Sequence, residues 1–479
     1  MTVSARSRTG RLVAAVATAA VLVLVAAGCS KSTTIDGVKV INVPADQPTI
    51  TKAVAAAKSG DMILVAPGTY KEAVDVDKDN LVIRGTDRNK VVLDGGFKLE
   101  NGIRVAGANG VVVENMTAQN YTSNGFYWTG VKGYRGSYLT ALRNGDYGIY
   151  AFDSVMGQFD HSYGGGSPDA GFYIGACYKC DAVITDVISE YNGLGYSGTN
   201  SGGDMYIVNS TFRYNRAGIV PNTGSYEACY PERNTVVAGN LVYSNNNGTS
   251  PAIDVALLAM GNGILPAGGI GNTITKNRVW DHERTGIGLV PFPEEDANDN
   301  PPSDDLVDRS CEQQKKDLDA NPPDPKAVGA VLWQPKNNTV TDNVVEGSGL
   351  GDIAVGTIDS DVSTLGNCFS GNTVGNSAPK NLQTLAPCTG TGSGSWSDGE
   401  LDLVTLIASK RPPAGDYKTQ PLPPKQPNMP NASTAPAKPM TSSPKKPDVA
   451  SIKVPAKPTD LGKPPATVST TAAPTTAGN

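Results

Sequence analysis

The chain contains very few histidines and few aromatic residues. His161 and His282 are the only histidines among 479 residues, so no zinc site built from histidines is expected. Aromatic residues make up 6% of the chain, which leaves little material for a thick globular core. Apolar residues seldom recur at helical spacing, which argues against helical and leucine-rich repeats.

Basic residues are scarce in the body of the chain. The formal net charge is −6, yet the segment 411–479 carries +6 and the segment 1–28 carries three arginines and no acid. The remaining body therefore carries −15. Because phosphate contacts need clustered Lys and Arg, this balance argues against nucleic acid as a partner.

What the sequence does contain is a repeat. A glycine followed by apolar residues recurs at Gly102, Gly125, Gly148, Gly171, Gly195 and Gly218, at an interval that is constant except for one extra position between Gly171 and Gly195. Short segments rich in Val, Ile, Tyr and Thr lie between these glycines and predict strands joined by turns. The sequence therefore predicts an all-β fold, a single-stranded right-handed parallel β-helix with coils of about 23 residues.

Asparagines recur at one corner of the predicted coils. Asparagine tolerates the left-handed conformation that a corner requires, and identical amides on neighbouring coils can stack as a ladder. We interpret this column as structural. Its members are Asn120, Asn144, Asn192, Asn215 and Asn245.

The N-terminus has the pattern of an export signal. Three arginines precede an apolar run from Leu12 to Ala27, which is short for a membrane span and ends just before Cys29. This arrangement resembles a bacterial lipoprotein signal, although Ala26 stands where the pattern usually has Leu. The resemblance implies lipidation of Cys29 and attachment to the cell membrane on its extracytoplasmic face. An uncleaved or ordinary signal peptide is the alternative.

Six cysteines remain after Cys29, and an even number in an exported chain favours disulfides. The C-x-x-C pair Cys177 and Cys180 has no second such pair or nearby histidine, so a local disulfide is preferred over redox or metal chemistry. Cys368 and Cys388 are separated by close to one coil, which favours a bridge between neighbouring coils. Cys229 and Cys311 each lie in an insertion that interrupts the period, and are expected to form the third bridge.

The chain divides by composition. Residues 1–28 form the signal peptide, 29–47 a spacer, and 48–390 the β-helix, with insertions near 222–232 and 290–326. An alanine-rich stretch, Ala53 to Ala57, predicts a short helical cap at the N-terminal end. Residues 391–479 are read as a flexible joint, a short helix and a disordered tail rich in Pro, Lys and Thr.

The entry segment, from Pro48-Thr49-Ile50 through Pro67-Gly68-Thr69-Tyr70, resembles that of the pectin-lyase-like superfamily of right-handed β-helices. The resemblance extends in pattern over residues 43–390. It implies a polysaccharide or cell-envelope glycan as the partner and, if the chain is an enzyme, a polysaccharide lyase, hydrolase or epimerase. The hydrolase and esterase motifs of the superfamily are missing. Tyr163-Gly164 and Pro168-Asp169 are similar to an epimerase motif whose histidine is absent.

Polar residues are densest between residues 160 and 206. General acid–base work needs two carboxylates near one bond, and the candidates are Asp169, Glu190 and Asp204 on consecutive coils. Tyrosine rings can stack on sugar rings. The candidates for binding substrate are Tyr150, Tyr173, Tyr196 and Asn200. The three tyrosines follow one another at the period of the repeat, which favours one vertical column. A stack inside the β-helix is the preferred alternative to an exposed sugar-binding strip.

The second insertion is acidic around Asp296 and Asp299, and clustered carboxylates can hold Ca²⁺. A solvated loop is the preferred interpretation, so no cofactor is expected beyond this candidate. Two functions stay open. The chain either binds, and in one version processes, a polysaccharide, or it is a non-catalytic envelope or adhesion scaffold. The sequence does not indicate an oligomeric state.

Overall fold

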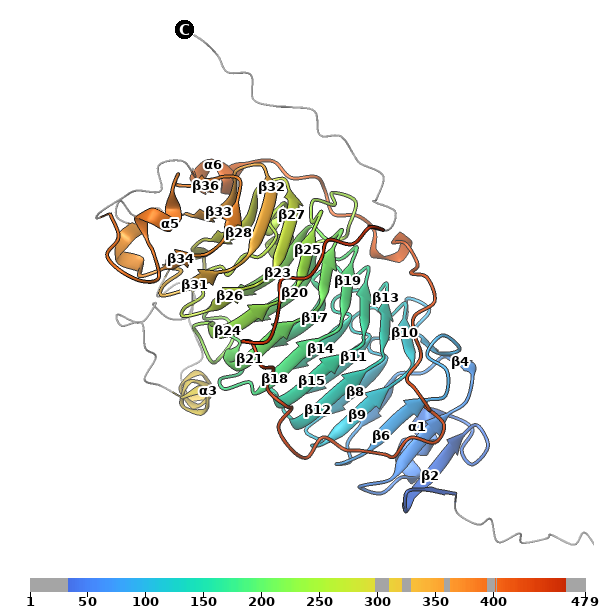
Figure 1. Ribbon diagram of the computed structural model, residues 1–479. Helices are drawn as coiled ribbons and strands as arrows, with labels where there is room; N and C mark the ends of the chain where they lie inside the picture. Colours follow the sequence, from blue (N-terminus) through green and yellow to red (C-terminus); the bar gives the residue numbers. More distant parts are fainter. Residues whose placement is uncertain are drawn as a thin grey trace, which may run out of the picture.

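Three parallel sheets, stacked coil on coil, build a right-handed β-helix (Figure 1). The computed structural model describes residues 33–297, 310–320, 329–356, 362–393, 401 and 403–461. Most coils contribute one strand to each sheet in turn. We call the 13-stranded sheet the first sheet, the 11-stranded sheet the second, and the 7-stranded sheet, with its 3-stranded extension, the third.

The first sheet consists of β1 (Thr34–Ile35), β2 (Val38–Val43), β3 (Met62–Val65), β6 (Val82–Gly85), β9 (Val111–Glu114), β12 (Lys132–Ser137), β15 (Val155–Asp160), β18 (Ala182–Thr185), β21 (Gly202–Val208), β24 (Arg233–Ala238), β26 (Thr273–Thr275), β31 (Thr339–Thr341) and β34 (Cys368–Ser370). The second consists of β4 (Gly68–Tyr70), β7 (Val91–Asp94), β10 (Thr117–Gln119), β13 (Thr140–Leu142), β16 (Tyr163–Gly165), β19 (Ile188–Glu190), β22 (Thr211–Arg213), β25 (Leu241–Tyr243), β27 (Arg278–His282), β32 (Val344–Ser348) and β35 (Thr373–Val374).

The third sheet consists of β5 (Val74–Val76), β8 (Ile103–Ala106), β11 (Phe126–Thr129), β14 (Ile149–Phe152), β17 (Ala170–Gly175), β20 (Leu194–Thr199) and β23 (Ala217–Asn222), extended by β28 (Thr285–Leu289), β33 (Gly351–Val355) and β36 (Ser377–Ala378). A separate antiparallel pair joins β29 (Phe292–Glu294) and β30 (Val331–Trp333). The helices are α1 (Ile50–Ala56), α2 (Asp254–Ala259), α3 (Cys311–Ala320), α5 (Leu382–Leu385), α6 (Leu403–Ala408) and the 3₁₀ turns η1 (Val362–Leu365) and η2 (Tyr417–Thr419).

Helix α1 covers the N-terminal end of the β-helix, as its alanine-rich sequence predicts (Figure 1). The Thr49 side chain caps it by accepting a hydrogen bond from the Lys52 amide, and Ile50, Ala53 and Val54 are buried. Within the described ranges, no helix is long and apolar enough to cross a membrane.

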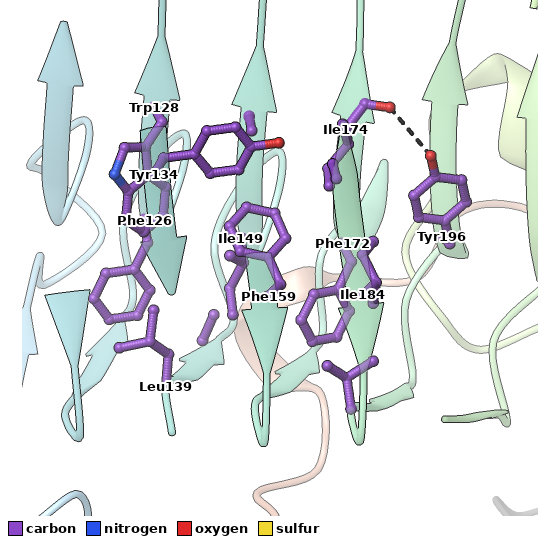
Figure 2. Packing of buried hydrophobic residues seen from close by; sticks show 14 of the residues in the cluster. Phe126, Trp128, Tyr134, Leu139, Ile149, Phe159, Phe172, Ile174, Ile184 and Tyr196 are labelled. Atoms are coloured by element: carbon purple, nitrogen blue, oxygen red, sulfur yellow. Dashed lines mark hydrogen bonds between the residues drawn. The ribbon is translucent and has the colours of Figure 1, made fainter. Parts of the chain in front are cut away.

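Inward side chains fill the interior of the β-helix with stacked apolar residues. Figure 2 shows this packing around Phe126, Trp128 and Phe159, with Tyr196 pointing inward and its hydroxyl bonded to the Ile174 carbonyl. The predicted lumen stack therefore holds for Tyr196. The column of three tyrosines on one face is wrong, because Phe172 pairs with Tyr196 while Tyr173 pairs with Ser197.

Amide ladders line the corners. Asn192 donates to Asn215, Asn215 donates to Asn245, and both Nδ2–Oδ1 distances are 3.0 Å. Asn245 then meets His282 at 3.2 Å. The predicted ladder is confirmed over these asparagines. Two predicted members lie outside the ladder. Asn120 donates to Asp94, and Asn144 accepts from the Tyr121 amide while its Nδ2 has no partner among the described residues.

Three disulfides join the six cysteines in the predicted pairs. The Cα–Cα distances are 4.9 Å for Cys177–Cys180, 4.4 Å for Cys229–Cys311 and 4.7 Å for Cys368–Cys388. The second bridge fastens the loop after β23 to α3. Cys29, the predicted lipidation site, lies outside the described residues.

Residues 410–461 differ from the predicted disordered tail. This segment, which we call the strap, runs along the outside of the β-helix toward α1 and back (Figure 1). Its carbonyls accept hydrogen bonds from arginines of the coils. Arg84 donates to Ala435 O at 2.6 Å, Arg143 to Gln420 O at 2.7 Å and Arg278 to Pro455 O at 2.6 Å.

Charge and apolar contacts complete the attachment of the strap. Lys446 pairs with Asp204 at 2.7 Å, and Lys457 pairs with Glu346 at 2.6 Å. Met440 packs against the apolar outer side of the first sheet. The strap needs no core of its own, because an extended chain leaves its carbonyls free for these donors. All of these contacts involve the first and second sheets and their corners. None of them involves the outer face of the third sheet, which α2 and α6 cover in part.

Candidate functional site

The outer face of the third sheet carries a column of aligned side chains. The register places Arg104, Tyr127, Tyr150 and Tyr173 side by side on β8, β11, β14 and β17. Alternate residues such as Phe126 and Ile149 point into the lumen. Tyr150 and Tyr173 therefore share this face as expected, and Tyr196 does not.

A cluster of tyrosines and carboxyls occupies the middle of this face. We call it the tyrosine–acid cluster, and its members are Asp146, Tyr147, Tyr150, Asp169, Tyr173 and Glu227. The ring of Tyr150 lies 4.3 Å from that of Tyr147 and 4.6 Å from that of Tyr173, between centroids. The Tyr173 hydroxyl donates to Glu227 Oε2 at 2.6 Å. Tyr147, Tyr150 and Glu227 are partly exposed, so a ligand can reach the cluster from solvent.

Asp169 is placed by the turn that leads into β17. Its backbone amide donates to Asp146 O at 3.2 Å, and its carbonyl accepts from Leu194 N at 2.7 Å. The side chain is 7% exposed, and its Oδ1 has no hydrogen-bond partner among the described residues. A buried polar atom without a partner is costly, so a hydrogen bond to this atom from water or a ligand would stabilise the folded protein.

Burial raises the pKa of Asp169 to about 8, against a hydrogen bond from Tyr147 that lowers it. The neighbouring carboxyls of Asp146 and Glu227 add to the rise. Burial likewise raises the pKa of Glu227 to about 7, against the hydrogen bond from Tyr173. Burial also raises the pKa of Asp146. Two carboxyls thus titrate near neutral pH, the range in which general acids and bases work.

Asn200 positions Glu227 and takes no part in an exposed binding surface. It is fully buried, and its Nδ2 donates to the carbonyls of Gly224 and Glu227 at 2.7 Å each. Its Oδ1 accepts from Gly224 N at 3.1 Å. These bonds hold the inserted loop after β23 so that Glu227 folds back over β17.

The other two catalytic candidates lie on other faces. Glu190 ends β19 in the second sheet, where Arg213 donates to it at 2.6 Å and the Tyr163 hydroxyl at 2.8 Å. Asp204 lies in β21 of the first sheet and pairs with Lys446 of the strap. The three predicted carboxylates therefore do not converge, because consecutive strands of one coil belong to different sheets.

Sequence reasoning missed Asp146, Tyr147 and Glu227. Asp146 and Asp169 lie one coil apart in the sequence, and this spacing was a usable signal. Glu227 gave none, because the sequence of an insertion does not reveal where its loop folds back.

Two hollows flank the cluster on the same face. One, of about 460 Å³, is lined by Asp75, Glu100, Arg104 and Tyr127 at the α1 end. The other, of about 80 Å³, is largely apolar and is lined by β23, α2 and α6 residues including Val220. The first hollow is within the size range of ligand pockets, and the second is much smaller.

The acidic-loop candidate for Ca²⁺ is only half described. Asp299 lies outside the described residues, and Asp296 lies at the end of a described range. Elsewhere in the described ranges, no three His, Cys, Asp or Glu side chains gather as a metal site. Calcium binding by Asp296 and Asp299 stays a prediction.

No family model matches the chain, and no curated protein sequence matches it. Among solved structures, it is similar to the A-module of mannuronan C-5 epimerase AlgE4 from Azotobacter vinelandii, at 13% identity and a TM-score of 0.47, covering 72% of this chain and 94% of that one. It is also similar to pectate lyase Pel9A, at 14% identity and a TM-score of 0.38, covering 80% and 84%. An alginate lyase from Paenibacillus sp. matches at 17% identity and a TM-score of 0.34, covering 50% and 86%. We transfer no residue roles from these structures.

Proposed function

We propose that the outer face of the third sheet binds a polysaccharide and that Asp169 and Glu227 process it by acid–base chemistry. The supporting observation is a pair of carboxyls with pKa values of about 8 and about 7 beside stacked tyrosine rings. The pair lies on the face that the strap leaves open, and tyrosine rings offer flat surfaces for pyranose rings.

The two carboxyls divide the proton transfers between them. Asp169, with the higher pKa, keeps its proton near neutral pH and donates it to the departing glycosidic oxygen. Glu227 ionises first and accepts a proton from the attacking water as the carbon–oxygen bond breaks. Lyase and epimerase reactions also need one proton acceptor and one donor, so this pair serves any of the three expected reaction types.

Separate substitutions test this assignment. Asp169→Asn and Glu227→Gln should each lower kcat on a polysaccharide found by screening by about 100-fold or more, since each removes a proton carrier while keeping its size. Asp186→Asn is the matched control, because Asp186 is exposed at the corner between the first and second sheets.

Circular dichroism and melting temperature check that the variants fold. Full turnover in a folded Asp169→Asn protein would rule out its role as the acid. Glycan binding without turnover in the wild-type protein would instead support the scaffold alternative.

We also propose that the protein is located in the cell envelope and attached to the membrane through a lipid on Cys29. The support is the basic, apolar and cysteine pattern of the segment that ends at Cys29. Cys29→Ala should leave the precursor unprocessed or release the protein into the medium, which blotting of detergent and aqueous phases measures. Unchanged partitioning into detergent would contradict the anchor.

A further inference from the structure

The tyrosine–acid cluster contains no cation. Besides burial, the groups that shift the two pKa values are carboxyls and phenols. They are Tyr147, Asp146 and Glu227 for Asp169, and Tyr173 for Glu227. Tyr226, from the same inserted loop as Glu227, also faces this pair. In the described part of the chain, no Lys, Arg or His contributes to either shift.

Three cations on this face and at its rims have partners outside the tyrosine–acid cluster. Arg104 lies three strands from Tyr173, roughly 14 Å at the usual strand spacing, and it pairs with Asp75 at 3.4 Å. Lys315 of α3 pairs with Asp153 at the rim. Arg216, at the other rim, donates to Gly248 O at 2.9 Å and to the strap. None of them is free to neutralise the carboxyls.

A positively charged ligand would supply the counter-charge that the tyrosine–acid cluster lacks. Buried carboxyls hold protons at neutral pH because no opposite charge stabilises their ionised form. The faces of stacked tyrosine rings attract cations. Asp169 Oδ1, buried and without a partner, offers an acceptor for an ammonium N–H. A glycan carboxylate placed here would find no cation to pair with in the cluster and would raise the pKa values of its carboxyls further.

We infer that the polysaccharide bound on this face carries free amino groups, with one ammonium seated against Tyr147, Tyr150 and Tyr173 and donating to Asp169. This inference rests on the proposed function and names its substrate class. The positive charge favours one ionised carboxyl in the pair, so that the pair shares one proton. One donor and one acceptor then remain, which is the state that hydrolysis requires.

Calorimetry on the full chain can test the charge of the ligand with three probes of equal length. They are oligomers of β-1,4-glucosamine, the same oligomers N-acetylated, and oligogalacturonate. We expect the free amine to bind at least about tenfold more tightly than the N-acetylated form. Titration at pH 5.5, where both carboxyls are protonated and the amine is charged, in two buffers of different ionisation enthalpy should show release of roughly one proton on binding the amine.

Variants connect the preference to the cluster. Glu227→Gln should lose the proton release, because Glu227 is the carboxyl that ionises first. Asp169→Asn should lose most of the amine preference, and Tyr150→Leu should weaken amine binding without abolishing proton release. Asp186→Asn should match the wild type. If Asp169→Asn does not fold, amine binding by Tyr150→Leu decides the test. Tyr150 is partly exposed, so its replacement should leave the fold intact.

The three probes distinguish a failure of the ammonium site from a failure of polysaccharide binding as such. Equal binding of the amine and N-acetylated oligomers, or tighter binding of oligogalacturonate, would overturn the ammonium site while leaving a polysaccharide-binding face in place. Binding of none of the three would contradict the proposed function itself.

Discussion

The fold itself raises the pKa values of Asp169 and Glu227 into the neutral range. Each is surrounded by phenols and other carboxyls, so folding removes water without supplying a counter-charge. Glu232 is a third carboxyl with a raised pKa. It is fully buried between Asn272 and Thr235, and burial raises its pKa to about 7 against the hydrogen bonds from both residues and the charge of Arg233. Because these carboxyls have raised pKa values in the folded protein, the free energy of unfolding depends on pH.

The sign of that dependence follows from the raised pKa values. Because the folded protein holds these protons to higher pH than the unfolded chain, their contribution is full below the unfolded pKa and is lost as pH rises through 7 and 8. His282 has the opposite effect, since burial lowers its pKa to about 3, but that effect is complete once the pH exceeds its usual value of 6.5.

We therefore predict that the melting temperature falls as pH rises from 6.5 to 8.5. The free energy of unfolding should drop by about 1.4 kcal/mol per pH unit for each carboxyl that stays protonated only in the folded state. Asp169→Asn should flatten the profile and exceed the wild type in stability at pH 8.5, whereas Asp186→Asn should follow the wild type. Scanning calorimetry across this range measures both, and a level wild-type profile would contradict the raised pKa values.

At the scale of strands and coils, much could be predicted because each coil repeats the physics of the last. The recurring glycines predicted the coils, and the recurring asparagines predicted the ladder from Asn192 to Asn245. The longer interval between Gly171 and Gly195 indicates that Tyr196 does not take the strand position of Tyr173. One extra residue moves a side chain to the opposite face of a strand, so Tyr196 points inward.

The site was less predictable because it joins different coils and a loop. Asp169 was identified, but its partner Glu227 comes from an insertion held by Asn200, and no periodic pattern locates such a loop. Glu190 and Asp204 were close to Asp169 in sequence yet belong to other sheets. Proximity along a coil is therefore a poor guide to proximity on a face.

At the scale of the whole molecule, the strap was the main departure from expectation. Its composition lacks apolar residues for a core, which indicated disorder. The residues that attach the strap are arginines of the coils. Arg88 and Arg216 are buried without carboxylate partners, and burial lowers their pKa values to about 9 and about 10. Their guanidinium groups donate to strap carbonyls instead, Arg88 to Pro427 and Arg216 to Pro412 and Pro413.

Removing the strap should therefore destabilise the β-helix on two of its three faces. A chain ending at Lys410 leaves Arg84, Arg88 and Arg216 without part of their acceptors, at about 1–3 kcal/mol for each polar group that stays buried and unpaired. We expect the melting temperature to fall by at least about 3 °C relative to the full chain. A chain ending at Leu461 is the matched control, because it keeps every strap contact described here.

Hydrogen exchange shows where the loss occurs. Amides of the first and second sheets near the strap should exchange faster in the chain ending at Lys410, and β11, β14 and β17 of the third sheet should keep their protection, since the strap leaves that face open. Binding of glycan to the tyrosine–acid cluster should survive at temperatures below the new melting point. Equal melting temperatures for the two truncated chains would contradict this prediction. They would show that water accepts hydrogen bonds from the arginines as well as the strap carbonyls do, and that the strap adds no stability to the β-helix.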